Sequence, residues 1–344
     1  MVGGGTPDTT VKSYWGGDIQ WFTPSEIGKN KYVDFSKRTI TRDGLDNSSA
    51  KLLPLHTILL SSRATVGECS IASNECTTNQ GFQSLIAKQC NIDFLYYLIQ
   101  TKKKDLIRNA CGSTFLEISA NEIRKIKVAV PVQNEQEQIA KLLSLIDERI
   151  ATQNKIIEKL QSLIKGLRVC CMQRVYGNNV YLSEIAQIYQ PQTISSTELT
   201  EDGFLVYGAN GIIGKYKDYN HETEQICITC RGNTCGMVNY TKPMSWITGN
   251  AMVINTDKYQ DKVCKRYLYH YLSAYNFNSI ISGSGQPQIV RTPLEKLKIT
   301  LPTISEQKQK AIIFDKIQDK IDINHKVLNL YIGQKQYLLR QMFI

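Results

Sequence analysis

The order of hydrophobic and polar residues divides this chain into four segments of two alternating kinds. Residues 1–131 and 177–301 contain short apolar runs broken by Gly, Asn and Ser, as in HTILLSSRATVG (56–67) and QICITCRGNTCGMVNY (225–240). This pattern is typical of strands joined by turns. Residues 132–176 and 302–344 instead repeat their apolar positions in steps of three and four, which predicts one long helix each. The expected order is therefore domain, helix, domain, helix.

Each strand-rich segment also contains one helical pattern, IDFLYYLIQTKKKDLIRNA (92–110) in the first and VCKRYLYHYLSAYNF (263–277) in the second. The fold class that we predict is α+β. Two similar domains, 1–131 and 177–301, are separated by the two long helices of 132–176 and 302–344.

The chain repeats itself at the junction between domain and helix. VAVPVQNEQEQIAK (128–141) and ITLPTISEQKQKAI (299–312) share a strand, a proline and the pattern Glu-Gln-x-Gln, and Pro131 and Pro302 stand 171 positions apart. Proline ends the strand, and Asn134 or Ser305 is the expected N-cap of the helix that follows. We interpret the chain as a tandem duplication of two similar halves.

Both helices carry a heptad-like seam, and each seam contains an internal amide. The first seam is Ile139, Leu143, Ile146, Ile150, Gln153, Ile157, Leu160, Ile164, Leu167 and Cys171; the second is Phe314, Ile317, Ile321, Asn324, Leu328, Tyr331, Lys335, Leu338 and Met342. A buried amide in a seam fixes helix register. Because Gln153 and Asn324 lie near the helix midpoints, an antiparallel pair about 55 Å long would bring them together at a pseudo-two-fold axis.

Composition narrows the class of protein. The net charge of +10 is spread along the chain, which favours a folded basic surface and a polyanionic partner. The sequence shows neither a membrane-spanning run nor a signal peptide, so we expect a cytoplasmic protein without a membrane partner. The ten cysteines lie mostly in apolar segments, where cysteine acts as a small hydrophobic residue.

Neither a phosphate-binding loop nor a zinc site fits the residue spacing of this chain. YGANGIIGKY (207–216) has Ala209 and Tyr216 where a phosphate-binding loop needs Gly and Ser or Thr. Cys227, Cys230 and Cys235, with His221 upstream, lack the second ligand pair of a zinc site. The chain also lacks a methyltransferase motif. We therefore expect no metal, no cofactor and no catalytic residue.

Four stretches carry a resemblance to a known family: IQWFTPSEIGK (19–29), IRKIKVAVPVQNEQEQIAKLLSLID (123–147), LEKLKITLPTISEQKQKAII (294–313) and YGANGIIGKY. Nearly the whole chain resembles the specificity (S) subunit of type I restriction-modification systems. The resemblance implies two target recognition domains that each read one half of a bipartite DNA site, with the coiled coil setting the spacer. It also implies a non-catalytic subunit that recruits two adenine-N6 methyltransferase (M) subunits and, through the complex, the restriction (R) subunits.

The chain departs from the family pattern at its start. The second domain begins with the segment NNVYLSEIAQIYQPQ (178–192), which has no counterpart before GGGTPDTT (3–10) in the first domain. By comparing the two halves, we expect about 10–20 residues to be missing from the first domain.

Loop residues with suitable side chains are the candidates for contact with double-stranded DNA, since Arg and Lys suit guanine and Asn and Gln suit adenine. They are Lys29, Lys31, Arg63, Thr65, Asn79, Gln80, Ser113 and Thr114 in the first domain, and Asn210, Lys215, Tyr216, Arg231, Asn233, Asn250, Gln286 and Gln288 in the second. Arg63 and Arg231 are expected to be equivalent, as are Asn79 and Asn250. For each amide, a plain turn residue is the alternative.

Two other functions stay open. The chain could belong to a fused restriction or modification enzyme that catalyses by itself, which methylation by the chain alone would reveal. It could also be an architectural coiled-coil adaptor, which would bind DNA without sequence preference.

Overall fold

The computed structural model describes residues 1–112, 115–173, 175–209, 211–283 and 285–343. The chain forms two compact units, unit 1 from Met1–Gln153 with Val327–Ile344 and unit 2 from Asn154–Lys326. The division runs through both long helices, α5 (Gln133–Gln173) and α8 (Ile304–Met342). The boundaries that we predict at residues 131, 176 and 301 stay predictions.

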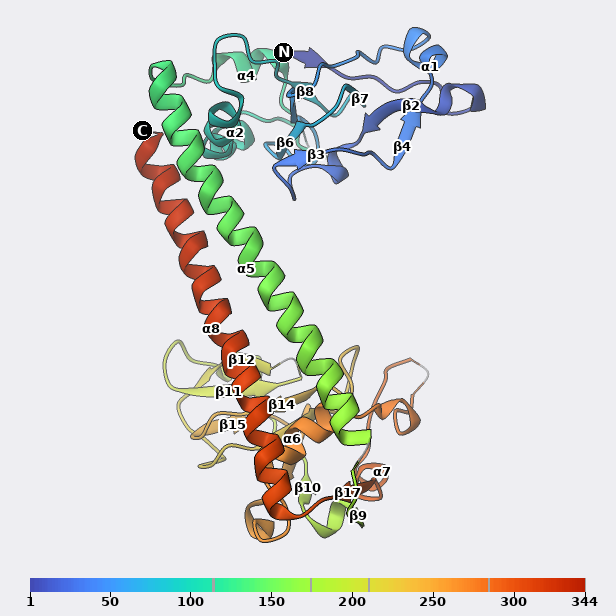
Figure 1. Cartoon of the computed structure of the whole chain (residues 1–344), viewed down its shortest axis with the longest axis vertical. Coiled ribbons are helices and arrows are strands. Elements are labelled where there is room, and N and C mark those ends of the chain that lie inside the picture. The colour runs from blue at the N-terminus through green and yellow to red at the C-terminus, as the bar shows by residue number, and fades with distance from the viewer. Residues whose placement is uncertain (113–114, 174, 210, 284, 344) are drawn as a thin grey trace. The chain divides into compact units, whose positions relative to one another are not determined.

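Unit 1 contains small sheets flanked by short helices (Figure 1). Its strands are β1 (Val2–Gly3), β2 (Trp15–Phe22), β3 (Tyr32–Val33), β4 (Arg38–Ile40), β5 (Ile58–Leu60), β6 (Cys69–Ala72), β7 (Cys76–Thr78) and β8 (Gln83–Ser84). Its short helices are α1 (Arg42–Asp46), α2 (Ile92–Thr101), α3 (Lys103–Arg108) and α4 (Ala120–Lys125). The strand orders are β4-β2-β7, β3-β6-β5 and β1-β8.

Unit 2 has a closely related layout. Its strands are β9 (Asn178–Tyr181), β10 (Gln187–Tyr189), β11 (Phe204–Gly208), β12 (Gly211–Tyr216), β13 (Ile226–Thr229), β14 (Val238–Tyr240), β15 (Ser245–Ile247), β16 (Ala251–Asn255) and β17 (Lys298–Leu301). Its short helices are α6 (Lys265–Ala274) and α7 (Arg291–Glu295). The strand orders are β10-β16-β13-β14, β12-β11-β15 and β17-β9.

The two units repeat the same strand pairings. In unit 1, β2 pairs with β4 antiparallel and with β7 parallel; in unit 2, β11 pairs with β12 antiparallel and with β15 parallel. The hairpin of β5 and β6 likewise corresponds to that of β13 and β14. The predicted α+β class and internal duplication are confirmed.

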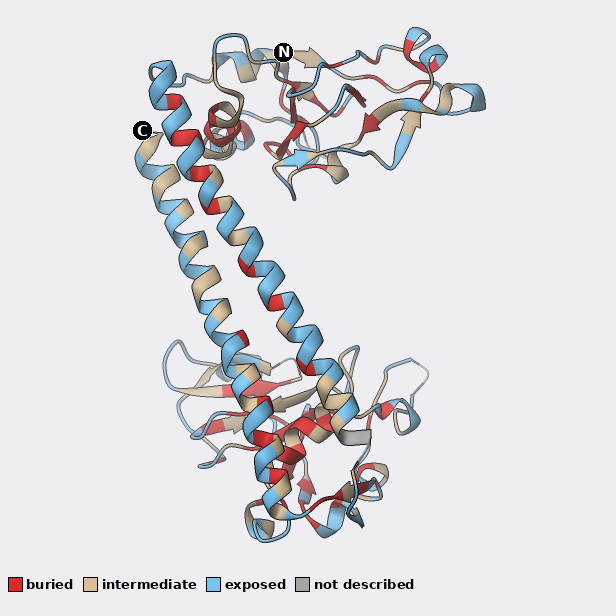
Figure 2. Cartoon of the chain, viewed as in Figure 1, coloured by how far each residue is buried: buried red, intermediate tan, exposed pale blue. Residues whose placement is uncertain are grey.

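In each unit, one half of α5 lies beside one half of α8, and the two run in opposite directions (Figure 1). In unit 1, Ile139 and Leu143 of α5 share a hydrophobic cluster with Leu338 and Met342 of α8. In unit 2, the cluster joins Ile164 with Phe314, Ile317 and Ile321. On α5 the buried positions recur along one face of the helix, while among the described residues of α8 buried positions occur only in its unit 2 half (Figure 2). The predicted seam is therefore the buried face in unit 2 and on α5 in unit 1, whereas the seam residues of α8 in unit 1 are partly buried.

The duplicated Glu-Gln pattern has a structural explanation. In unit 2 the Gln307 side chain is buried. Its Oε1 accepts a hydrogen bond at 2.8 Å from the N–H of Cys264, which is the N-cap of α6. Its Nε2 donates to the Pro302 carbonyl at 2.9 Å. Gln136 repeats both contacts in unit 1, with the N–H of Asn91 at 2.9 Å and the Pro131 carbonyl at 2.8 Å. Each glutamine thus joins the start of a long helix to the start of a domain helix.

The helices begin slightly earlier than we predicted. They start at Gln133 and Ile304 rather than after Asn134 and Ser305. The Thr303 hydroxyl accepts a hydrogen bond from the N–H of Glu306 at 3.3 Å, so Thr303 and not Ser305 caps α8. The pattern of polar residues before Glu306 left both caps possible, because serine and threonine accept this bond in the same way.

A buried histidine of α6 and charged side chains of both long helices hold these helices together in unit 2. The His270 side chain is fully buried, and the Arg168 guanidinium of α5 lies 2.9 Å from its Nδ1. Because arginine can only donate, Nδ1 accepts and the ring proton is on Nε2, which donates to Asp315 of α8 at 2.7 Å. Burial lowers the pKa of His270 and therefore keeps the imidazole neutral at pH 7.

Unit 1 has a polar cluster at the equivalent place. Ser144 stands where unit 2 has Asp315 and accepts a hydrogen bond from Lys31 Nζ at 2.7 Å. The Tyr97 hydroxyl donates to Asp147 at 2.7 Å, and Asp147 forms an ion pair of 2.7 Å with Lys335 of α8. Polar contacts of this kind restrict how a domain helix can sit on the helix pair.

None of the helices in the part of the chain that the structure describes is long and apolar enough to cross a membrane.

Candidate DNA-binding loops

In unit 1, two loops are joined by backbone hydrogen bonds. The first, residues 61–68, connects β5 and β6; the second, with described residues 111–112 and 115–117, follows α3. The N–H of Ala64 donates to the Leu116 carbonyl at 3.0 Å, and the N–H of Ile118 donates to the Ser62 carbonyl at 2.9 Å. Isolated bridges also link Glu117 with Arg63 and Cys111.

Unit 2 contains the same pair of loops, residues 230–237 and, in the second loop, the described residues 282–283 and 285–288. The N–H of Gly232 donates to the Pro287 carbonyl at 3.0 Å, and the N–H of Ile289 donates to the Cys230 carbonyl at 3.0 Å. Isolated bridges link Gln288 with Arg231 and Ser282. Arg63 and Arg231 therefore occupy the same structural position, as the sequence predicted.

The backbone after each arginine is in the left-handed region. Ala64 has φ +63° and Gly232 has φ +88°. A non-glycine residue rarely adopts this conformation, and here the hydrogen bond to the second loop holds it. In the second loop, Gly112 and Gly283 also have positive φ, and a Cβ on Gly283 would lie 2.4 Å from the Gln286 carbonyl oxygen. Glycine is thus required at the start of this loop.

Both arginine side chains are exposed, but their neighbours differ. Arg63 lies 3.8 Å from the Glu117 carboxylate and 6.0 Å from the centre of the Phe115 ring. Unit 2 has Gln288 where unit 1 has Glu117, so the carboxylate is replaced by an amide that carries no charge. The two loops therefore present the same arginine in different surroundings.

A third loop follows β7 in unit 1 and β15 in unit 2, and it corrects one predicted equivalence. The N–H of Ser62 donates to the Gly81 carbonyl at 2.8 Å, and the N–H of Cys230 donates to the Asn250 carbonyl at 3.1 Å. Asn250 thus corresponds to Gly81 and not to Asn79. The Asn79 side chain accepts a hydrogen bond from the N–H of Gly81 at 2.9 Å, as a turn residue does.

Lys31 makes internal contacts that count against a role in DNA binding. Its ammonium forms an ion pair of 2.8 Å with Asp93 and donates to Tyr97 and Ser144, and only 13% of its side chain is exposed. Burial opposes ionisation of Asp93, but hydrogen bonds from Lys31 and Tyr32 outweigh it and hold the pKa of the carboxyl below its usual value. Lys31 stabilises unit 1, and we leave it out of the proposed DNA contacts.

The other described candidates lie on accessible loops or strands. Lys29, Thr65, Gln80, Asn233, Asn250 and Gln286 are exposed, and Gln288 is partly buried. Lys215 lies 3.4 Å from Asp202, and the Tyr216 ring packs edge-to-face against Trp246 at 5.0 Å. Ser113, Thr114 and Asn210 lie outside the described residues.

Two exposed side chains near these loops did not stand out in the sequence. Phe115 is 59% exposed beside Arg63. Arg38 of β4 stacks on Trp15 at 3.5 Å from the ring centre and remains exposed. An aromatic residue after Gly-Ser-Thr and the Lys-Arg pair at 37–38 are the signals that could have identified them.

The cysteine-rich segment of unit 2 packs as part of the core. Cys227 is fully buried on β13, and burial raises the pKa of its thiol to about 12. The His221 ring contacts the Tyr189 hydroxyl at 2.8 Å. Within the described residues, no three His, Cys, Asp or Glu side chains come together in a group that could hold a metal ion.

The family model for the type I restriction modification DNA specificity domain matches this chain twice, over residues 2–162 and 178–330. The chain belongs to this family. The two matches coincide with the two halves of the internal duplication, so the specificity domains of the family are the two strand-rich domains with their helices.

Two curated specificity subunits illustrate the similarity. The MjaIX subunit of Methanocaldococcus jannaschii is 40% identical over 171 residues, which cover 46% of this chain and 39% of that protein. The EcoprrI subunit of Escherichia coli is 27% identical over 340 residues, which cover 91% of this chain and 84% of that protein. The first similarity is confined to part of the relative, whereas the second spans most of both chains.

The fold of this specificity-family chain is also found in solved structures. The S subunit of the type I restriction-modification system from M. genitalium matches 98% of this chain and 99% of its own, with a TM-score of 0.64 and 18% identity. A chain from a study of complex assembly and conformational transition of the type I R-M system matches 90% of each chain, with a TM-score of 0.58 and 14% identity. Both support the architecture of two similar domains and two long helices.

Proposed function

We propose that this chain is the DNA-reading, non-catalytic subunit of a type I restriction-modification complex. The observation that carries the proposal is the duplicated arginine loop, in which Arg63 and Arg231 have the same backbone contacts but different neighbours. Each unit would read one half of a bipartite, asymmetric DNA site. The family match and the curated specificity subunits support this function.

We further propose that the long helices recruit the partner subunits. Leu142 of α5 and Ile313 of α8 occupy equivalent positions in the duplication, and they are 39% and 56% exposed. Each has an exposed apolar neighbour on its helix, Leu145 (48%) and Ile312 (54%). Groups of exposed apolar side chains are typical of contact surfaces for other proteins. The repeated position suits two copies of one methyltransferase subunit, which would bring the restriction subunits into the complex.

A footprinting experiment with the methyltransferase subunits present tests the DNA function. We expect protection of two short DNA segments separated by an unprotected spacer. The logarithm of the binding constant should fall linearly with the logarithm of the salt concentration, because phosphate contacts release counterions. Uniform protection without a preferred sequence would favour an architectural adaptor instead. Methylation by this chain alone would favour a fused enzyme.

We propose that Gln153 and Asn324 set the register of the helix pair and with it the spacer length. Gln153 is 8% exposed on the seam, and Asn324 of α8 donates to the Lys320 carbonyl at 2.6 Å. The two residues belong to different units, and their direct contact is a prediction. Changing both to leucine should raise the free energy of unfolding and broaden the range of spacers that the complex accepts. An unchanged spacer preference, measured by methylation profiling, would count against this role.

A further inference from the structure

Unit 1 carries a group of basic residues on the segment that leads from α2 to the second of its paired loops. This segment is KKKDLIRNA (102–110), most of which forms α3, and it holds four basic residues and one acidic residue. The segment of unit 2 between the end of α6 and the equivalent loop is YNFNSII (275–281), which contains no charged residue. The two units therefore differ in charge at the same place in the duplication.

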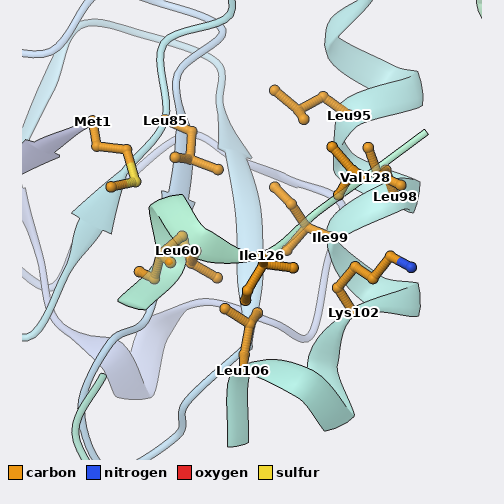
Figure 3. A pocket seen from close by; sticks show the side chains of 11 residues that line it. Met1, Leu60, Leu85, Leu95, Leu98, Ile99, Lys102, Leu106, Ile126 and Val128 are labelled. Carbon is orange, nitrogen blue, oxygen red and sulfur yellow. The ribbon is translucent and has the colours of Figure 1, made fainter. Parts of the chain in front are cut away.

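The packing of α3 leaves two of these cations on its outer face. Leu106 is 3% exposed and lines an apolar pocket together with Leu98 and Ile126, so its side of α3 faces the core (Figure 3). Lys104 and Arg108 are exposed, and a spacing of four residues puts them on one face of the helix, opposite Leu106. Unit 1 thus presents two positive charges side by side to the solvent.

The same helix is attached to both of the paired loops of unit 1. Arg108 stands three positions before Cys111, where the second loop begins. The Lys103 ammonium forms an ion pair with Glu68, the last residue of the first loop. Lys103 also packs against Gly67, where a Cβ would lie 2.9 Å from the lysine Cγ. The outer face of α3 therefore borders the loops that we propose to contact DNA.

Both exposed cations of α3 are available to an anion from solution. Within the described residues, Lys104 takes part in no ion pair, whereas Arg108 lies 3.5 Å from Asp105. The Arg108 side chain is 77% exposed, and an exposed pair of this kind contributes little. A phosphate can therefore replace or share the carboxylate contact at small cost.

The charges beside the two arginine loops are arranged in the opposite way. In unit 1, the Glu117 carboxylate lies 3.8 Å from Arg63 and offsets part of its charge. In unit 2, Gln288 bridges to Arg231 at the equivalent position and carries no charge. Unit 1 thus has the more neutralised arginine but, on α3, two cations that the equivalent segment of unit 2 lacks.

We propose that the outer face of α3 is a phosphate-binding surface, on which Lys104 and Arg108 each contact one phosphate beside the half-site of unit 1. Contacts to phosphate position a protein on DNA without reading bases. The complex would therefore be held electrostatically through α3 on one half of its site and not through the equivalent segment on the other. This proposal rests on the DNA function proposed above.

Salt titration tests the proposal on the complex with the methyltransferase subunits and a duplex that carries the sequence found by methylation profiling. Each lost phosphate contact makes the slope of the logarithm of the binding constant against the logarithm of the salt concentration smaller by about 0.9. Lys104→Ala together with Arg108→Ala should therefore reduce the slope by about 1.8 and leave the preferred bases of both half-sites unchanged. Ethylated phosphates should cease to interfere with binding at positions in one half-site only.

Two matched variants separate a local contact from the total charge of the chain. Lys104→Arg together with Arg108→Lys keeps both charges and should keep the slope of the unaltered chain. Lys88→Ala removes an exposed cation that precedes α2, at the end of that helix remote from α3, and should also leave the slope unchanged.

The outcomes distinguish this proposal from the DNA function itself. A normal footprint with an unchanged slope in the double alanine variant overturns the role of α3 alone. A slope that Lys88→Ala reduces as much as Lys104→Ala does, or a change in the preferred bases, also overturns it. If the unaltered complex protects no preferred sequence, the DNA function fails and the role of α3 fails with it.

Discussion

Replacing Gln307 with leucine is expected to lower the free energy of unfolding of unit 2 by about 2–4 kcal/mol, because buried polar partners then lose their hydrogen bonds. Gln307 is 1% exposed; its Oε1 accepts from the N–H of Cys264, and its Nε2 donates to the Pro302 and Lys262 carbonyls. Leucine fills a similar volume but satisfies none of these groups. Hydrogen exchange with mass spectrometry should show faster exchange at the start of α6 and of α8.

The matched control is Gln309→Leu. Gln309 belongs to the same Glu-Gln-x-Gln pattern but is exposed, so its replacement should change stability by less than about 0.5 kcal/mol. Gln136→Leu should repeat the effect in unit 1 and leave exchange in unit 2 unaltered. If Gln307→Leu and Gln309→Leu show the same amide hydrogen exchange at the starts of α6 and α8, Gln307 does not hold these two helices together.

The same motif shows how far the sequence alone could lead. The recurrence of Pro and Glu-Gln-x-Gln was enough to predict two helix starts and a duplicated fold. It could not distinguish Gln307 from Gln309, because the pattern does not tell which amide faces the domain. That distinction depends on the N-cap of α6, which lies more than 40 residues away in the chain.

Offsets between the halves explain why one equivalence was predicted correctly and another was not. Gly112 and Gly283 stand 171 positions apart, like the helix residues, and both have positive φ. The strand region follows other spacings, since Arg231 stands 168 positions after Arg63. Asn250 stands 171 positions after Asn79 in a similar sequence, but hydrogen bonding places it opposite Gly81, 169 positions before it.

Individual loop side chains were harder to predict than the fold. Lys31 and Lys29 look alike in the sequence, but Lys31 points toward Asp93 and Ser144, while Lys29 is exposed. The direction of a long side chain depends on which acidic group the tertiary fold brings close. Composition and spacing do not contain that information.

The two arginine loops yield the second large expected effect, which rests on the proposed DNA function. Arg231→Ala should relax sequence preference in one half-site only, at a cost of about 1–3 kcal/mol for the preferred base, because a bidentate contact to guanine is lost. Arg63→Ala should do the same in the other half-site. Methylation profiling with the assembled complex measures both halves in one experiment.

The pattern of losses separates base reading from phosphate contact. If Arg231 binds phosphate, its replacement should weaken binding to all sequences equally. The slope of the logarithm of the binding constant against the logarithm of the salt concentration should then become smaller by about one. If it reads a base, the salt dependence should change little and the loss should be confined to sites with that base. Arg63 has the Glu117 carboxylate at 3.8 Å, whereas the equivalent Gln288 carries no charge. Glu117→Gln should therefore make the charge around Arg63 like that around Arg231 and strengthen the phosphate contacts of the unit 1 loop. Equal relaxation of both half-sites by Arg231→Ala would contradict the assignment of one half-site to each unit.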